Sequence, residues 1–462
     1  MQPCSRIPQT IRLSRALAAA VCVALAGTTT PARSQGAFSS EDRARLVAFW
    51  NQPGRVQISV SPDASQAGPF KVRLTTEGSR WFLAYQRALG ATATPPSQDA
   101  QAAAPRQQVW ESWVASRLAY DRWVAQTTAD TANAALKQPP TAPALPPPAP
   151  HPGPIPDDLL SAVGAPPPAL ARAVTPTQHT IALEDGEGYV FQTHVGVRER
   201  YAYYRFAEGT IALGPLLRNL PEEELRTLFE SAGFSPSEQR VARAVSRLEG
   251  GFESVNTYDT GYISIGFIQF ASLEQGRGSL MAVMAREKSE RPADFERDFR
   301  RYGVDLAPDN TLIVVDPGSG AELQSAQAVL KVIEDKRFAA VFQRAGRHSL
   351  AFRVAQIQVA KSRYWPLDDR FSVMLEDGTL LQGKVSDVIR SEAGIATLFD
   401  RKVNRGSIGP FAEVLKTMAT EKGLKTVDEL AAQEHALVKA MKYRADFLAD
   451  PALSQPTAPP IP

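Results

Sequence analysis

A proline-rich tract is the feature that most constrains how this 462-residue chain can fold. Ten prolines fall within residues 139–156, and Pro166, Pro167 and Pro168 prolong the run. Proline fixes φ and lacks a backbone N–H, so such a tract forms an extended, semi-rigid spacer. We therefore predict a small domain over 39–137, a linker over 138–177 and a larger domain over 178–450, with a disordered Pro-rich tail over 451–462. A proline-rich recognition motif is the alternative interpretation of the tract.

The first 34 residues have the pattern of an export signal. Arg6, Arg12 and Arg15 precede a twelve-residue apolar run over 16–27, and small-residue cleavage sites follow, the later one ending at Ser34. The run is too short to span a bilayer comfortably. The pattern predicts a signal peptide over 1–34 and an exported protein, periplasmic or extracellular. A retained anchor is the alternative.

Composition excludes several classes of function. The two cysteines, Cys4 and Cys22, both lie in the predicted signal, and the five histidines are scattered, so we expect no disulfide framework, no metal site and no cofactor. Lys and Arg number 51 against 49 Asp and Glu, which disfavours a nucleic-acid partner. No stretch after the signal reaches 18 apolar residues, so no membrane span is expected in the processed protein.

The region 39–137 predicts a small α+β domain rich in tryptophan. Helices are expected from Ser40 to about Trp50, from Thr76 through Tyr85, and over 106–135, with strands at 56–60 and 71–74. Five of the six tryptophans fall here, namely Trp50, Trp81, Trp110, Trp113 and Trp123. They could stack on sugars, but an aromatic core is the interpretation that we favour. The sequence does not indicate a protein partner for this region.

The region 178–450 predicts an α+β domain that is mostly α. Short strands are expected near 181–183, 189–193, 201–206, 258–269, 311–315 and 371–384. Helices are expected at 220–231, 235–249, 292–302, 321–334, 335–346, 350–363, 384–392, 394–401, 408–422 and 426–447. The small β region near 258–269 follows a helix directly and carries the candidate chemistry.

Glu249 is the candidate general acid. A helix over 236–248 is expected to stop at Gly250-Gly251, which places Glu249 at its C-terminus. The negative end of the helix dipole and apolar neighbours both disfavour an ionised carboxyl. A carboxylic acid kept protonated near neutral pH is what glycosidic cleavage requires. A carboxylate that merely ends a helix is the alternative.

Asp259, ten residues later, is the candidate second carboxylate. It lies in a glycine-punctuated segment that ends in Gly266-Phe267-Ile268-Gln269-Phe270. Asp-Thr-Gly is also an ordinary turn sequence, so a turn role for Asp259 stays open. Tyr258, Ser264 and Gln269 either bind sugar or hold the β segment together, and both interpretations stay open.

The order of these features resembles the lysozyme-like superfamily, which includes lysozymes, soluble lytic transglycosylases and chitosanases. Two later stretches agree: residues 352–358 with Tyr364-Trp365-Pro366 resemble the chitosanase "FR-x-AQ…Y-x-P" helix, and 398–406 resembles a helix with "D-x-x-V-N/Q-x-G". The similarity covers roughly 235–445. The chain departs from the pattern at Gly250, where transglycosylases usually have Ser, and in the short spacing from Glu249 to Asp259.

The resemblance implies a lysozyme-like domain that cleaves β-1,4 bonds of an aminosugar polymer. Peptidoglycan is the first choice of polysaccharide and chitosan the second. Glu249 would be the acid, Asp259 would hold water or stabilise positive charge, and Tyr258, Ser264, Gln269 and Asn404 would bind substrate. A transglycosylase would need Glu249 alone. The alternative is a catalytically silent lysozyme-like scaffold that binds cell-wall glycan.

Overall fold

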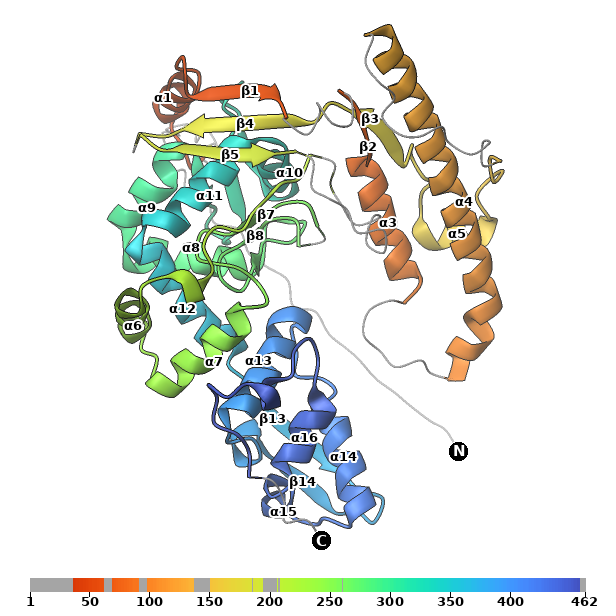
Figure 1. Ribbon diagram of the computed structural model, residues 1–462, viewed down its shortest axis with the longest axis vertical. Coiled ribbons are helices and arrows are strands. Elements are labelled where there is room, and N and C mark those ends of the chain that lie inside the picture. The colour runs from red at the N-terminus through yellow and green to blue at the C-terminus, as the bar shows by residue number, and fades with distance from the viewer. Residues whose placement is uncertain are drawn as a thin grey trace, which may run out of the picture. The chain divides into compact units, whose positions relative to one another are not determined.

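The computed structural model describes residues 36–61, 69–90, 98–136, 150–184, 186–193, 206, 208–259 and 261–457. The predicted signal, most of the proline tract, the strand expected at 201–206 and residues 458–462 lie outside this described part. Helices predominate and the sheets are small, which confirms the predicted mostly-α, α+β class (Figure 1).

A three-stranded antiparallel sheet joins the first residues after 36 to the larger region. Helix α1 (Ser40–Trp50) leads into β1 (Val56–Val60), which pairs with β4 (Thr177–Ala182), and β5 (Gly188–Gln192) completes the order β1-β4-β5 (Figure 1). Trp50 belongs to the main hydrophobic core and donates its ring N–H to the carbonyl of Tyr302 at 3.1 Å. Helix α1 and β1 therefore pack with the larger region rather than with the helices that follow them.

The tryptophan-rich helices form a second hydrophobic cluster. Strand β2 (Lys71–Leu74), α3 (Thr76–Ala88), α4 (Gln98–Ala135) and α5 (Asp157–Val163) contribute to it, together with Leu170, which directly precedes β3 (Ala171–Val174). Trp81, Trp110 and Trp113 are buried there, as the aromatic-core interpretation expects, and Trp123 is half-buried. Strand β3 pairs antiparallel with β2, with Leu74 opposite Ala171.

The stretch expected as a linker is thus partly folded. Helix α5 starts directly after Pro156 and ends at Gly164, whose φ of +84° suits a glycine, and β3 follows. Proline restricts only its own φ and the residue before it, so the chain can regain regular structure as soon as the prolines thin out. The extended spacer predicted for the centre of the tract lies outside the described residues.

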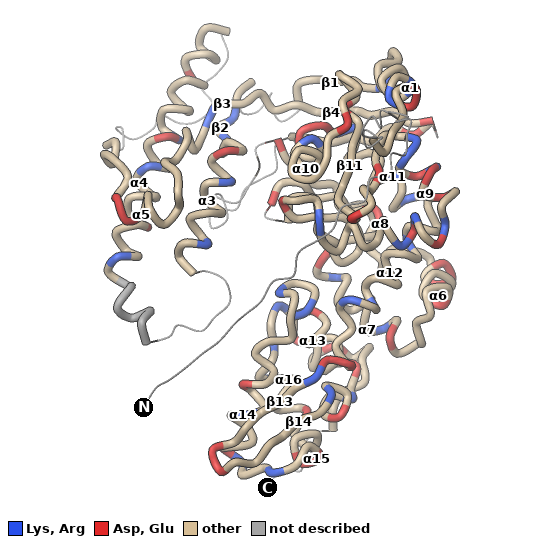
Figure 2. Tube along the Cα trace, turned by 180° about the vertical axis from the view of Figure 1, so that it is seen from behind, with Lys and Arg blue, Asp and Glu red and all other residues tan. Residues whose placement is uncertain are grey.

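The larger region is built around one extensive core. Its elements up to residue 364 are β6 (Ile211–Ala212), α6 (Glu222–Ser231), α7 (Pro236–Ser246), β7 (Val255–Asn256), β8 (Ser264–Ile265), β9 (Phe270–Ala271), α8 (Ser279–Glu290), α9 (Pro292–Asp298), β10 (Val304–Leu306), β11 (Leu312–Val315), β12 (Glu322–Gln324), α10 (Ser325–Glu334), α11 (Lys336–His348) and α12 (Leu350–Tyr364). The helices expected at 220–231, 335–346 and 350–363 are confirmed to within two residues. Helix α6 opens with Glu222, Glu223 and Glu224, which complement the positive end of its dipole (Figure 2).

Helix α8 was not expected from the sequence. Its turns present Leu280, Met281, Val283 and Met284 to the core, so the apolar positions do not form one narrow stripe. It also lacks a side-chain cap, because Gly278 precedes it. A helix buried on more than one side gives a weak periodic signal, and tertiary packing decides its conformation.

The last region contains a hairpin and four helices. Strands β13 (Arg370–Met374) and β14 (Leu380–Lys384) pair antiparallel, and α13 (Glu392–Arg405), α14 (Phe411–Lys422), α15 (Val427–Ala431) and α16 (Glu434–Met441) follow. Residues 451–457, expected in a disordered tail, are ordered. Leu453 is buried, and the amide of Ser454 donates to Glu392 Oε2 at 2.9 Å. The buried carboxylate of Glu392 accepts this hydrogen bond and holds the segment in place, a contact that composition alone does not reveal.

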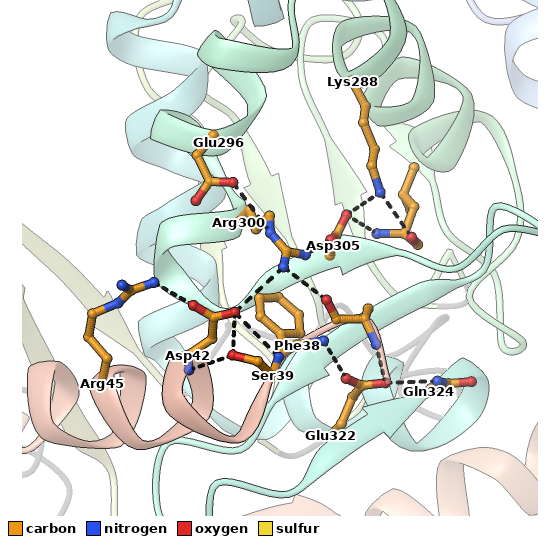
Figure 3. A network of polar contacts seen from close by, with 12 residues as sticks. Phe38, Ser39, Asp42, Arg45, Lys288, Glu296, Arg300, Asp305, Glu322 and Gln324 are labelled. Atoms are coloured by element: carbon orange, nitrogen blue, oxygen red, sulfur yellow. Dashed lines mark hydrogen bonds and ion pairs between the residues drawn. The ribbon is translucent and has the colours of Figure 1, made fainter. Parts of the chain in front are cut away.

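A polar network fastens the segment before α1 to the core. Glu322 accepts hydrogen bonds from the amides of Ala37 (3.2 Å) and Phe38 (3.0 Å). Arg300 donates to the carbonyl of Ala37 at 2.9 Å and stacks over the ring of Phe38, 4.5 Å from its centroid (Figure 3). Phe38 in turn packs in a small apolar cluster with Leu46, Ile313 and Val315.

Replacing Glu322 with Ala should lower the free energy of unfolding by about 1–3 kcal/mol, because two partly buried amides would lose their acceptor. Chemical denaturation followed by circular dichroism measures the loss. Arg45→Ala is the matched control, since it removes only a surface ion pair to Asp42 and should cost less than about 1 kcal/mol. Equal stability of the two variants would show that the network does not hold the segment.

Candidate functional site

Glu249 lies in a tight turn between α7 and the small four-stranded sheet. A capping box between Ser235 and Glu238 starts α7, and Val241, Ala244 and Val245 bury its inner face. The helix ends at Ser246, two residues earlier than predicted, and the amide of Glu249 donates to the carbonyl of Ser246 at 3.1 Å. Strands β7, β8 and β9 follow and pair with β6, which precedes α6 in the chain, so the expected order of helix, acid and β segment is present.

Arg444 holds the carboxylate of Glu249. Its Nη2 donates to Glu249 Oε1 at 2.5 Å, and its Nε donates to Asp400 Oδ1 at 2.9 Å. The side chain of Glu249 is 12% exposed and that of Asp400 only 1%. Asp400 comes from α13, and Arg444 follows α16, so three separate elements meet at this cluster. We call Glu249, Asp400 and Arg444 the acid–arginine cluster.

Burial dominates the electrostatics of Glu249. Removal of water raises the pKa of its carboxyl, and the charges of Asp400 and, to a smaller extent, Asp259 raise it further. Arg444 opposes the shift both as a charge and as a hydrogen-bond donor, but the net direction is upward. The pKa of Glu249 is thus raised, the direction that the sequence predicts, and burial is the largest cause.

Asp259 serves a turn in the described structure. Its Oδ2 accepts from Asn256 Nδ2 at 2.7 Å, and its Oδ1 accepts from the amide of Gly261 at 2.9 Å. A Cβ on Gly261 would lie 2.4 Å from Ser264 Oγ and 3.3 Å from Asp259 Oδ1, so both side chains approach this glycine closely. Both oxygens of Asp259 already accept hydrogen bonds, as a carboxylate that closes a local turn does.

Gln269 lies beside the turn that carries Glu249. It has a left-handed φ of +57°, and its Nε2 donates to the carbonyl of Gly266 at 3.0 Å. The same nitrogen would lie 3.7 Å from a Cβ on Gly250, the residue after Glu249. Gln269, a sequence-predicted binding residue, therefore lies beside the turn of the candidate acid.

Of the other three predicted binding residues, Ser264 is buried in β8, and Tyr258 and Asn404 have different surroundings. Tyr258 is half-buried, and its backbone carbonyl accepts from the amide of Phe206 at 2.7 Å. Asn404 is exposed on α13, and its Oδ1 accepts from the hydroxyl of Tyr443 at 2.7 Å, next to Arg444 in the chain. Asn404 is thus hydrogen-bonded to the residue that precedes Arg444 in the chain, whereas Tyr258 directly precedes Asp259.

Gln356 ties the candidate site to α12. It is fully buried, its Nε2 donates to the carbonyl of Phe252 at 3.1 Å, and its Oε1 accepts from the amide of Phe267 at 3.3 Å. Gly266 has a φ of +87°, and a Cβ there would lie 2.1 Å from Gln356 Oε1. This glutamine therefore joins α12 to the turn at Phe252 and to the β segment at Phe267.

Replacing Gln356 with Leu should lower the free energy of unfolding by about 2–4 kcal/mol, because a buried amide and a buried carbonyl would both lose their partner. Urea denaturation measures the change. Gln358→Leu is the control on the same helix, since its Oε1 accepts only from the Arg286 side chain near the surface. If the two variants are equally stable, the hydrogen bonds of Gln356 to Phe252 and Phe267 do not stabilise the fold.

Sequence reasoning missed Arg444. No motif surrounds it, and it lies 195 residues after Glu249, so only the packing of the last region brings the two together. Among the described residues, no group of three His, Cys, Asp or Glu side chains could hold a metal ion. Within that same part of the chain, every helix is too short or too polar to cross a bilayer.

Comparison with protein-family models, with curated proteins and with solved structures gave no match for this chain.

Proposed function

We propose that this chain is an exported enzyme that cleaves β-1,4 glycosidic bonds of an aminosugar polymer, with peptidoglycan as first choice and chitosan as second. Glu249 acts as the general acid. The observation that supports this role is a largely buried carboxyl with a raised pKa, in the turn between a helix and a small sheet. Such a group keeps its proton at a pH where an ordinary glutamate has lost it.

Arg444 fixes which oxygen of Glu249 donates the proton. Because Oε1 accepts from Arg444, Oε2 is the atom left to carry the proton and to give it to the glycosidic oxygen. After bond cleavage, the same Oε2 can take a proton from the attacking hydroxyl or water. The acid and base steps then use one oxygen, while Arg444 keeps the carboxyl oriented.

The contacts of the other two carboxylates, Asp259 and Asp400, favour a mechanism in which Glu249 is the only catalytic carboxyl. Both oxygens of Asp259 accept hydrogen bonds within a turn, and Asp400 is buried against Arg444. Neither is poised to activate water in this arrangement. We therefore favour a lytic transglycosylase, in which the sugar's own 6-hydroxyl attacks, over a two-carboxylate hydrolase.

Digestion of purified murein and of chitosan, with products read by mass spectrometry, tests the proposal. Anhydro ends from murein indicate a transglycosylase, and reducing ends from either polymer indicate a hydrolase. Intact polymer after prolonged incubation with folded protein would contradict an enzyme.

A second candidate is a catalytically silent, glycan-binding scaffold. The Arg444–Glu249 ion pair favours it, because a permanent cation at 2.5 Å stabilises the ionised carboxylate, which cannot act as an acid. Co-sedimentation with murein sacculi separates the two candidates. Binding without release of soluble fragments supports the scaffold.

A further inference from the structure

Strand β1 is an open edge of the sheet β1-β4-β5. Among the described residues it pairs with β4 alone, and Figure 1 shows it at the outer edge of the sheet. The amide of Ala182 donates to the carbonyl of Arg55 at 2.8 Å, and the amide of Ser61 donates to the carbonyl of Pro176 at 2.9 Å. The odd-numbered residues of β1 therefore face β4. Because directions alternate along an antiparallel strand, the N–H and C=O groups of the even-numbered residues point away from the sheet.

The side chains of these even-numbered residues are apolar and exposed. Val56, Ile58 and Val60 lie on the face of the sheet that also carries the buried Ile181 and Phe191. Ile58 is nevertheless 61% exposed and Val60 57%, so the apolar face extends beyond the core. A groove of about 590 Å³ lies on the same face, between β1 and the junction of α10 and α11. A strand added at this edge would point every second side chain toward that groove.

Strand β1 lacks the features by which edge strands avoid pairing with other chains. Its sequence, Val-Gln-Ile-Ser-Val, contains no charge and no proline, and no bulge interrupts its pairing with β4. The alternation of apolar and polar residues is the same in both directions along the strand. An antiparallel copy of β1 is therefore complementary to β1 itself, with Ile58 opposite Ile58 and Val56 opposite Val60.

We propose that β1 pairs with β1 of a second copy of this chain across a two-fold axis at Ile58, which joins two three-stranded sheets into one antiparallel sheet. In this register every residue that points outward meets another that points outward, so each such pair is hydrogen-bonded. A shift by one residue would lose these bonds and turn the partner's apolar side chains to the other face. Strand β1 shares no residue with the acid–arginine cluster, so this pairing is independent of the proposed glycan cleavage.

Sedimentation velocity of the full chain, purified after export, tests the proposal over a range of protein concentrations. A contact of one short strand belongs to the weak class of interfaces, so we expect a monomer–dimer equilibrium with a Kd of about 10–100 μM. The fraction of dimer should rise with concentration and stop at two copies, because the pairing uses up both open edges.

Ile58→Lys is the critical variant, because it sets two ammonium groups opposite each other at the axis. It should weaken the dimer at least about 10-fold and melt like the wild type, since the side chain is mostly exposed. Val190→Lys is the matched control. It adds the same charge at a half-exposed position of β5, on the other face of the same sheet, and should dimerise like the wild type.

A mixture of Ile58→Lys and Ile58→Glu tests the two-fold register itself. Each variant alone repels its own copy, but the mixture sets an ammonium opposite a carboxylate and should restore a dimer. A contact elsewhere on the surface would not respond to mixing. Ile58→Pro is a second variant, which removes only an N–H that points away from β4; edge strands tolerate such a proline, and this variant should stay monomeric.

A wild type that stays monomeric at about 500 μM would overturn the proposal. Equal dimerisation of the wild type and Ile58→Lys would overturn it too, as would a mixture of the Lys and Glu variants that stays monomeric. Far-ultraviolet circular dichroism of each variant separates a lost dimer from a lost fold. Binding of an extended peptide by a monomeric wild type would assign the edge to another protein instead.

Discussion

Replacing Glu249 with Gln should reduce the release of soluble fragments from murein by roughly 10²–10⁴-fold, the usual value of a positioned acid–base group. The amide oxygen of Gln can still accept from Arg444, so the arrangement around it should persist. The amide cannot give a proton to the glycosidic oxygen. Turnover measured by turbidity loss of sacculi, with melting temperature and sacculus binding alongside, gives the comparison.

Glu223→Gln is the control for this experiment, because Glu223 lies on the exposed first turn of α6 and pairs only with Arg226 on the same helix. It should leave turnover unchanged. Should Glu249→Gln cleave murein as fast as the wild type does, Glu249 is not the acid. If neither the wild type nor the variant cleaves but both bind, the scaffold candidate takes its place.

The pH profile of the wild type carries a second signature of Glu249. The acid must be protonated to act, so turnover should fall as the pH rises through its raised pKa.

Asp259→Asn tests the mechanism in the same assay. In a single-acid transglycosylase the loss should be below about 10-fold, while a two-carboxylate hydrolase should lose nearly as much as with Glu249→Gln.

Local signals allowed the sequence to predict the surroundings of Glu249 well. The cap at Ser235, the apolar positions of α7 and the Gly-Gly pair after Glu249 all act over a few residues, and the structure has the helix and turn where they predict them. The strands of the small sheet are only two residues long, yet the glycines between them marked the region. Such signals need no knowledge of the rest of the chain.

Contacts between distant segments account for what the sequence missed. Strand β1 pairs with β4, more than a hundred residues later, and β2 pairs with β3 across the proline tract. Composition marked that tract as a boundary, but the pairing of its flanks depends on registers that no local pattern encodes. Arg444 was overlooked for the same reason, since its importance arises from the buried carboxylates that packing places beside it.

Removing the arginine of the acid–arginine cluster should have the largest effect on stability. In Arg444→Met, the buried carboxylate of Asp400 loses its cation, and Glu249 loses its donor. Breaking a buried ion pair by deleting one partner costs about 3–5 kcal/mol. Urea denaturation at pH 7 should show a loss of this size, whereas Arg226→Met, which removes only surface pairs on α6, should cost less than about 1 kcal/mol.

The pH dependence of that loss identifies its cause. Without Arg444, the folded-state pKa of Glu249 rises further above its unfolded value, so the folded state binds more protons than the unfolded state does. Stability must then fall as the pH rises. The deficit of Arg444→Met should be smallest at acid pH, where Glu249 is protonated in either state, and largest above its raised pKa. A deficit that does not change with pH would point to lost packing instead.

The double variant Arg444→Met/Asp400→Leu completes the argument. It removes the buried carboxylate together with its cation, and a buried ion pair can often be replaced by apolar side chains at little cost. The double variant should therefore recover most of the stability that Arg444→Met loses, and Glu249 should remain as the one titrating group of the cluster. In an active enzyme, the alkaline limb of the pH profile should then move to higher pH, because the loss of Arg444, which lowers the pKa of Glu249, outweighs the loss of Asp400, which raises it. No recovery in the double variant would show that Arg444 stabilises the fold through contacts other than Asp400.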